Sequence, residues 1–317
     1  MRTLLLAVVS LSLLISSLLI SGAAQDAAQD QPPSSLDLRP DAQGQLSQEQ
    51  MRALTRVVAQ NYRDNYKKER DYTFIDREVV EKLDGNGGVK STETKTYEII
   101  KLYGEPVMRL IEKDDKPLEG RDAEKESDRI DKLMAKWRDE SDDDRKKREA
   151  ELEKQRQKNR EFVAEVADAY NFRMEPRETL NGRQCWVLSG EPRPEYQPKS
   201  REARMLPKFH GRIWIDETEL QLVKMDVEAI DTVSFAWGLA RLHKGTRFVY
   251  EQMRVNDEVW LPEHYEARLD ARIGFFKSEM VQNAGTFRDY KKFRTTAKIV
   301  GVGEVKHPES RQEAPQP

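Results

Sequence analysis

Cysteine is almost absent from this chain of 317 residues, which contains only Cys185. No intramolecular disulfide can form, so the fold must depend on an ordinary hydrophobic core. Cys185 stands in the run Cys-Trp-Val-Leu, which favours a small buried side chain over a reactive thiol. Histidine is also scarce. No metal site and no cofactor is predicted, because metal-ligand spacing is missing among the four histidines, His210, His243, His264 and His307.

Sequence signatures of catalysis are missing as well. The chain has no Gly-x-Ser-x-Gly, no P-loop, no Gly-x-Gly-x-x-Gly and no His-Glu-x-x-His. The glycines at Gly85–Gly88 lie between two strand-like runs without a following lysine, which indicates a hairpin turn and not a phosphate-binding loop. We therefore predict that the protein is not an enzyme. A hydrolase with an unrecognised acid pair stays an open alternative, because Asp and Glu are too numerous for any pair to stand out.

The chain has no strong excess of either charge. Its 54 Lys and Arg oppose 57 Asp and Glu, and this balance excludes the basic field that a nucleic-acid partner requires. Charged residues nevertheless make up 35% of the sequence, and they are concentrated in residues 119–170. This segment has neither glycine nor proline after Gly120 and predicts a long charged helical insertion.

Two helices are expected within this insertion. The first has one apolar stripe at helical spacing, formed by Ile130, Leu133, Met134 and Trp137. The second begins near Ser141, where acidic residues favour a helix start. Its middle, residues 145–159, has only two apolar side chains and is predicted to be a solvated arm or to fray, and apolar spacing resumes at Phe162.

A long hydrophobic run occurs only at residues 3–20, after the basic Met1-Arg2. Small residues follow, so we predict a signal peptide at 1–24, cleaved after Ala24, and a periplasmic mature protein. No cysteine lies near this point, which excludes lipoprotein acylation. An uncleaved anchor remains an alternative, since an apolar run of about 18 residues can just span a bilayer. Residues 25–45 and 304–317 are polar and are predicted to be a disordered leader and tail.

Residues 46–118 combine a helix with strands. A capping box at Ser47–Gln50 opens a helix that reaches about Lys67. Two strand-like runs, 72–83 and 89–102, form a hairpin, and a third strand follows at 106–112.

Residues 171–303 read as β-structure throughout. The Asn181-Gly182 dipeptide between two strand-like runs is a strong hairpin signal. Further strands are expected at 208–216, 220–230, 247–255, 259–270, 272–282 and 290–300. One early helix, several strands, a helical segment and then many strands predict an α+β fold, a curved antiparallel β half-barrel with helices on its concave side.

Apolar residues occupy a connection that is usually polar, between Asp231 and Gly245. Beside the cations of this segment they suit an acyl chain with an anionic headgroup, or a membrane surface. A second aromatic pair follows in a neighbouring strand. The equally favoured alternative is that these side chains are the inward faces of strand ends. The predicted ligand-binding residues are Phe235, Trp237, Leu239, Phe275 and Phe276.

Several segments in order resemble the LolA-like outer-membrane lipoprotein-sorting family. The segments are a Gly-x-Ile-Trp-Ile-Asp strand and its return within Phe209–Asp226, the Gly-Arg-x-x-Trp-Val-Leu strand at Asn181–Leu188, Asn256–Pro262, and Phe287–Phe293. The resemblance covers most of residues 72–300. The small lipoprotein carrier of that family lacks the long charged insertion, and no residue of this chain matches a known lipid-contacting position of the carrier.

The resemblance implies a half-barrel with a hydrophobic cavity for lipid or lipoprotein acyl chains. On that basis we predict an exported, non-enzymatic binding protein of the cell envelope, with membrane contact at most transient. The main alternative is a structural or protein-interaction module that docks an envelope protein through its charged helices.

Overall fold

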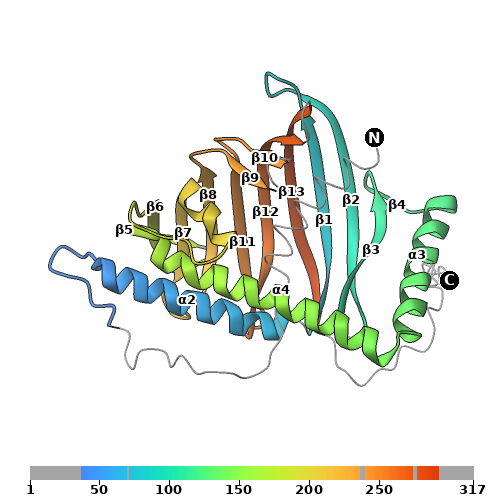
Figure 1. The fold of residues 1–317 in the computed structure, drawn as a ribbon, viewed down its shortest axis with the longest axis horizontal. Coiled ribbons are helices and arrows are strands. Elements are labelled where there is room, and N and C mark those ends of the chain that lie inside the picture. The colour runs from blue at the N-terminus through green and yellow to red at the C-terminus, as the bar shows by residue number, and fades with distance from the viewer. Residues whose placement is uncertain (1–36, 70, 104, 236–239, 274–276, 293–317) are drawn as a thin grey trace, which may run out of the picture.

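The computed structural model describes residues 37–69, 71–103, 105–235, 240–273 and 277–292 (Figure 1). Its helices are α2 (Gln48–Glu69), α3 (Gly120–Arg138), α4 (Asp142–Ala169) and the 3₁₀ helix η1 (Glu202–Lys208). Its strands are β1 (Tyr72–Leu83), β2 (Val89–Leu102), β3 (Glu105–Lys113), β4 (Lys116–Pro117), β5 (Tyr170–Leu180), β6 (Arg183–Pro192), β7 (Phe209–Asp216), β8 (Leu222–Ala229), β9 (Val233–Phe235), β10 (Ala240–Leu242), β11 (Arg247–Val255), β12 (Val259–Ile273) and β13 (Lys277–Lys292).

All described strands belong to one large sheet with the order β4-β3-β2-β1-β13-β12-β11-β8-β7-β6-β5, and β9 and β10 attach beside β12. Every described pair is antiparallel. Strand β1 pairs with β13, so the first and last described strands are neighbours within the sheet. The sheet is open, and the predicted α+β class with a large antiparallel sheet is confirmed.

The predicted capping box at Ser47–Gln50 and the predicted helix start near Ser141 are both present. The backbone N–H of Gln50 donates to Ser47 Oγ at 3.2 Å, and the Ser47 N–H donates to Gln50 Oε1 at 2.8 Å, so both groups of the capping box are satisfied. Ser141 caps α4 by accepting from the Asp144 N–H at 3.1 Å. The Asn181-Gly182 turn also forms, with φ values of 49° and 76° that suit a type I′ hairpin.

Helices α2 and α4 cross one face of the sheet, which we call the inner face (Figure 1). The apolar side of α2 and the C-terminal end of α4 pack on strands β5–β7 there. The buried members of this core include Met51, Leu54, Val58, Ala169, Phe172, Met174, Leu188 and Ile215. The main hydrophobic core therefore lies at one end of the sheet, between β5–β7 and the two helices.

Helix α3 packs at the opposite end of the sheet. Its predicted stripe of Ile130, Leu133, Met134 and Trp137 contacts Leu102 and Val107 of β2 and β3. Helix α4 is continuous over 28 residues, and ion pairs between residues three apart stabilise its exposed N-terminal half modestly. The structure thus has a helix across residues 145–159. That these helices are an insertion into a smaller family plan stays a prediction.

The strand boundaries after residue 259 differ from the sequence prediction. Strand β12 continues to Ile273, and β13 runs from Lys277 to Lys292, so a break between 282 and 290 is wrong. Asn283 and Gly285 resemble turn residues, but both lie inside β13 with regular partners on β1 and β12. Residues 293–300 of the predicted last strand lie outside the described residues, and η1 was not predicted from the sequence.

Candidate functional site

One transverse row of residues crosses the inner face from β5 to β2. Directly opposed residues of an antiparallel sheet share a face, so the register defines this row. In order it contains Met174, Leu188, Ile213, Met225, Tyr250, Tyr265, Gly285, Glu78 and Lys95. The row is apolar where α2 and α4 cover it and becomes polar and charged towards β1 and β2. The inner face therefore has two chemically different halves.

Aromatic rings form a continuous strip along β1, β13 and β12 on this face. Tyr72 contacts Tyr290 at 6.5 Å between ring centroids, and Tyr290 contacts Phe74 at 5.2 Å. Phe74 contacts Phe287 at 5.9 Å, and Phe287 contacts Tyr265 at 5.8 Å. We call these five residues the aromatic strip. Their spacing is that of favourable edge-on and tilted ring pairs.

The aromatic strip ends in buried polar atoms that have no hydrogen-bond partner. Asp76 is 6% exposed, Tyr265 5% and Asn283 1%. The Asp76 Oδ1, the Tyr265 hydroxyl and both polar atoms of the Asn283 amide are unpartnered. With the buried Glu78 these residues form what we call the polar patch. Buried polar groups are nearly always hydrogen-bonded in folded proteins, so four orphan atoms at one place require an explanation.

The surroundings of the polar patch disfavour the ionised forms of its two carboxyl groups. Burial, and then the neighbouring Glu78, raise the pKa of Asp76 well above its usual range. Burial likewise raises the pKa of Glu78, and Lys95 opposes this effect only in part. Lys95 Nζ is engaged by Glu93 at 3.0 Å. The patch therefore holds two carboxyl groups whose negative charge is poorly compensated.

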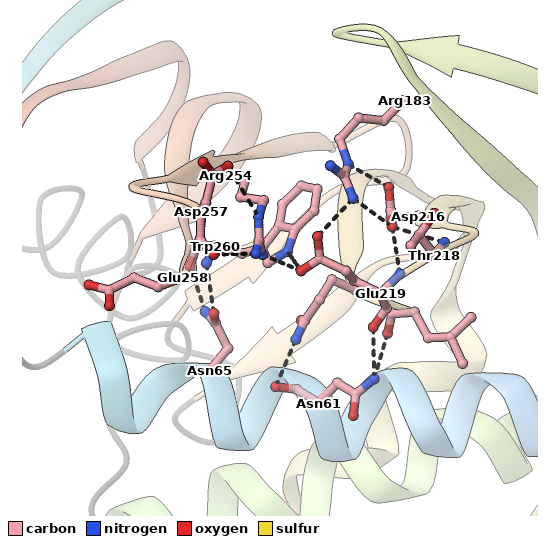
Figure 2. A network of polar contacts seen from close by, with 12 residues as sticks. Asn61, Asn65, Arg183, Asp216, Thr218, Glu219, Arg254, Asp257, Glu258 and Trp260 are labelled. Atoms are coloured by element: carbon pink, nitrogen blue, oxygen red, sulfur yellow. Dashed lines mark hydrogen bonds and ion pairs between the residues drawn. The ribbon is translucent and has the colours of Figure 1, made fainter.

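A network of polar contacts fixes the C-terminal half of α2 to the lower ends of the strands (Figure 2). Asn61 Nδ2 donates to the carbonyls of Glu219 and Leu220 at 3.2 and 3.0 Å. Asn65, which is buried, pairs with both backbone groups of Trp260: its Nδ2 donates to the carbonyl, and its Oδ1 accepts from the N–H at 2.7 Å. These bonds hold the end of α2 beside β12.

Glu219 joins this network to the outer side of the sheet (Figure 2). It accepts from Arg183 at 2.8 Å, from the Trp260 indole N–H at 3.0 Å, and from Arg254. Arg183 also donates twice to Asp216, at 2.6 and 3.1 Å. Although burial opposes it, the hydrogen bond from Arg183 holds the pKa of Asp216 below its ordinary value. This network therefore supports the fold.

The predicted ligand-binding residues lie mostly beyond the description. Phe235 ends β9 and is paired in register with Ala240 of β10. Trp237, Leu239, Phe275 and Phe276 lie outside the described residues. Two other apolar residues of the same connection, Val233 and Leu242, are buried together with Ala267, Leu269 and Ala271. The five predicted residues remain a prediction.

The remaining reactive side chains have structural surroundings. Cys185 is fully buried, which confirms the predicted packed side chain, and burial raises the pKa of its thiol to about 11. Three histidines each contact one carboxylate: His210 with Glu191 at 3.3 Å, His243 with Asp270 at 3.2 Å and His264 with Glu266 at 3.1 Å. Among the described residues, no three His, Cys, Asp or Glu side chains gather as metal ligands.

No helix within the described ranges is both long and apolar enough to cross a membrane.

Sequence reasoning missed the polar patch, although β1 carries a signal for it. Every second residue from Tyr72 reads Tyr, Phe, Asp and Glu, that is Tyr72, Phe74, Asp76 and Glu78. Alternate residues of a strand share a face, so two carboxyl groups follow two aromatic rings onto the same surface.

Known proteins resemble the chain in structure but not in sequence. No family profile and no curated protein matches it. Similar solved structures include a DUF1329 family protein from Desulfovibrio piger (8% identity, 77% of this chain and 93% of that chain, TM-score 0.30). An outer membrane lipoprotein-sorting protein domain from Vibrio parahaemolyticus matches at 11% identity over 77% and 95%, TM-score 0.27. A LolA superfamily protein from Nitrosomonas europaea matches at 8% over 77% and 94%, TM-score 0.28.

The resemblance predicted from the sequence is thus found again among structural neighbours, which include lipoprotein-sorting and LolA superfamily proteins.

Proposed function

We propose that this protein is an exported, non-enzymatic binding protein of the cell envelope that takes the acyl chain of a lipid or lipoprotein against the inner face of its sheet. The observation that carries the proposal is the aromatic strip that ends in unpartnered buried polar atoms. A surface that is apolar along its length and polar at one end matches the shape of an amphiphile.

The unpartnered polar atoms beside the buried aromatic strip have an energetic cost that a bound headgroup would offset. Each buried polar group left without a partner costs about 1–3 kcal/mol, so such groups persist where they serve another purpose. An acyl chain laid on the strip would leave water at about 0.8 kcal/mol for each buried CH₂. The residues 1–24 that read as a signal peptide support export, and the lack of catalytic motifs supports binding without chemistry.

Native mass spectrometry of the purified chain lacking residues 1–24 tests the proposal directly. We expect bound lipid to co-purify and to be lost when the strip is shortened by Phe287→Ala. Val89→Ala removes an exposed apolar side chain at the hairpin end of β2 and is the matched control, which should retain lipid. A folded protein that carries no lipid, and that binds none when mixed with a bacterial lipid extract, would contradict the proposal.

The apolar connection is tested in the same assay. Trp237→Asp should reduce lipid retention if Phe235, Trp237 and Leu239 line the path to the strip, and Val89→Asp places the same charge at an exposed site as a control. Unchanged retention in Trp237→Asp would remove this segment from the site and leave the strip standing.

A second function uses the charged helices. Helix α4 has a continuous, largely exposed polar middle, and α3 is fixed to β2 and β3 by its apolar stripe, so the pair can present a rigid charged surface to an envelope protein. Replacing Lys146 and Lys147 by glutamate should abolish such docking and leave lipid retention unchanged, which separates the two functions.

A further inference from the structure

Asp76 is the carboxyl group of the polar patch whose ionised form is least compensated. Its side chain is buried, its Oδ1 has no partner, and the influences on it, burial and Glu78, both oppose ionisation. Arg77, the next residue, points to the other face of the sheet, where it forms two hydrogen bonds with Asp115 at 2.8 and 2.9 Å. Among the described residues, no cation contributes to the electrostatics of Asp76.

Acceptor atoms converge around this carboxyl group. Asp76 and Glu78 are alternate residues of β1 and therefore share a face. The Tyr265 ring lies across β13 towards Glu78, and its hydroxyl is within reach of the Glu78 carboxyl group and the Asn283 amide. The Asn283 carbonyl oxygen is a further unused acceptor. The patch offers two carboxyl groups, a phenol oxygen and an amide oxygen, which outnumber the donors present.

Aromatic faces complete the surroundings. Phe287 and Tyr97 are the direct register neighbours of Asp76 on β13 and β2, and both lie on the inner face. Phe287 belongs to the aromatic strip, so the strip leads directly to the carboxyl pair. Aromatic rings beside carboxylates are the surroundings that organic cations prefer, through ring quadrupole and charge together.

Lys95 does not already fill this role. It opposes Glu78 in register, but its Nζ contacts Glu93 at 3.0 Å, and it is absent from the influences on Asp76. With Lys95 engaged by Glu93, Asp76 and Glu78 remain as two buried carboxyl groups whose ionised forms are poorly compensated by the described residues. A ligand with several N–H donors and a positive charge would satisfy both needs at once.

We propose that the polar patch binds the ammonium headgroup of an amphiphile whose apolar chain lies along the aromatic strip. The inference rests on the proposed function and adds the class of headgroup. The ammonium donates to Asp76 and Glu78, with Asn283 Oδ1 or the Tyr265 oxygen as a third acceptor. The site thereby selects cationic or zwitterionic amine headgroups over neutral and anionic ones.

Isothermal titration calorimetry with three probes of equal chain length tests this assignment. Dodecylammonium, dodecyl maltoside and dodecyl sulfate are titrated below their micelle concentrations into the chain lacking residues 1–24, with circular dichroism to verify that the protein stays folded. We expect dodecylammonium to bind about tenfold or more tightly than the other two, as charge-assisted hydrogen bonds imply. Butylammonium should bind weakly at the same site and compete.

Isosteric variants locate the site. Asp76→Asn and Glu78→Gln should each reduce the preference for dodecylammonium about tenfold while leaving dodecyl maltoside unchanged. Glu81→Gln is the matched control, because Glu81 lies on the same strand but on the opposite face. The preference of this variant for dodecylammonium should equal that of the unchanged protein.

The outcomes separate the two levels of the proposal. Equal binding of all three probes, or an undiminished preference in Asp76→Asn, would overturn the ammonium site and leave acyl-chain binding intact. Binding of none of the probes by folded protein would overturn both. A preference that survives in Asp76→Asn but disappears in a variant at 231–245 would transfer the headgroup site to that segment and would also refute the assignment.

Discussion

The ring of Tyr265 lies directly over Gly285 on the inner face of the sheet. A Cβ atom built on Gly285 would be 2.0 Å from Cε1 of that ring and 2.6 Å from Cζ, distances that no real contact allows. Gly285 is the register partner of both Tyr265 on β12 and Glu78 on β1. The glycine therefore lets the tyrosine cross β13 and bring its hydroxyl to the carboxyl pair.

Gly285→Ala should displace the Tyr265 ring and disturb both packing and binding. Overpacking of a well-filled site costs about 1–3 kcal/mol, and we expect a loss of that size in the free energy of unfolding measured by urea. Binding of dodecylammonium should weaken because an acceptor moves away. Gly85→Ala lies in open space at a turn and is the matched control, expected to change neither quantity measurably.

The buried carboxyl groups make stability depend on pH. Burial and the neighbouring Glu78 raise the pKa of Asp76 in the folded state above the ordinary value of an aspartate, so the native state holds this proton more tightly than the unfolded chain. Stability is then fully present below pH 4 or so and falls as pH rises through the folded value. Glu78 adds the same sign, and Glu93, Lys95, Tyr97 and Tyr265 are the other titratable groups that face the pair.

Asp76→Asn should therefore stabilise the ligand-free protein, more at pH 7.5 than at pH 4. A gain of 1 kcal/mol corresponds to a rise of about 2–4 °C in Tm for a chain of this size, measured by thermal unfolding at both pH values. Asp115→Asn changes an exposed carboxylate on the other face and should not show this trend. If Asp76→Asn raised Tm less at pH 7.5 than at pH 4, the buried Asp76 would not be the source of the pH dependence.

Local signals predicted much of this fold because each rests on a few neighbouring residues. The capping box at Ser47, the Asn181-Gly182 turn and the stripe that includes Ile130 and Trp137 are all present. Alternation along β1 and β2 likewise predicted their bounds. In each case backbone geometry and side-chain spacing agree within one element, which is where sequence patterns are most informative.

The pairing of β1 with β13 was beyond reach of the sequence. It joins residues about two hundred positions apart, and it alone brings Asp76 and Glu78 beside Gly285 and Phe287. Gly285 and Asn283 are residue types that are common in turns. The reason for a glycine inside β13 is the Tyr265 ring, which comes from another strand and cannot be inferred from the neighbouring sequence. The candidate site was therefore missed for the same reason that the strand boundaries were wrong.

The bonds between Asn65 and Trp260 should be a principal anchor of α2. Asn65→Ala would leave the buried N–H and carbonyl of Trp260 without partners, and each such group costs about 1–3 kcal/mol. We expect a loss of about 2–4 kcal/mol in urea unfolding. Asp64→Ala changes the neighbouring exposed position and should cost much less. Equal losses in the two variants would mean that the Asn65 bonds contribute little.

The pair between Arg183 and Asp216 should be the most sensitive ion pair of the network. Asp216 is 1% exposed and receives two hydrogen bonds from the guanidinium, so Arg183→Met would leave a buried carboxylate without its cation, held only by the backbone N–H groups of Thr218 and Glu219. Breaking a buried pair in this way costs about 3–5 kcal/mol, whereas Arg138→Met at the exposed pair with Asp139 should cost under about 1 kcal/mol.

The free energy of unfolding at acidic pH provides a second measurement on the pair of Arg183 and Asp216. Because the pKa of Asp216 is lowered in the folded state, its contribution is present above the unfolded value and is lost as pH falls. Arg183→Met should therefore lose less stability on acidification than the unchanged protein, and Asp216→Asn in the same background should restore part of the free energy of unfolding at pH 7. Strictly additive effects of the two substitutions in urea unfolding would show that the pair is not coupled.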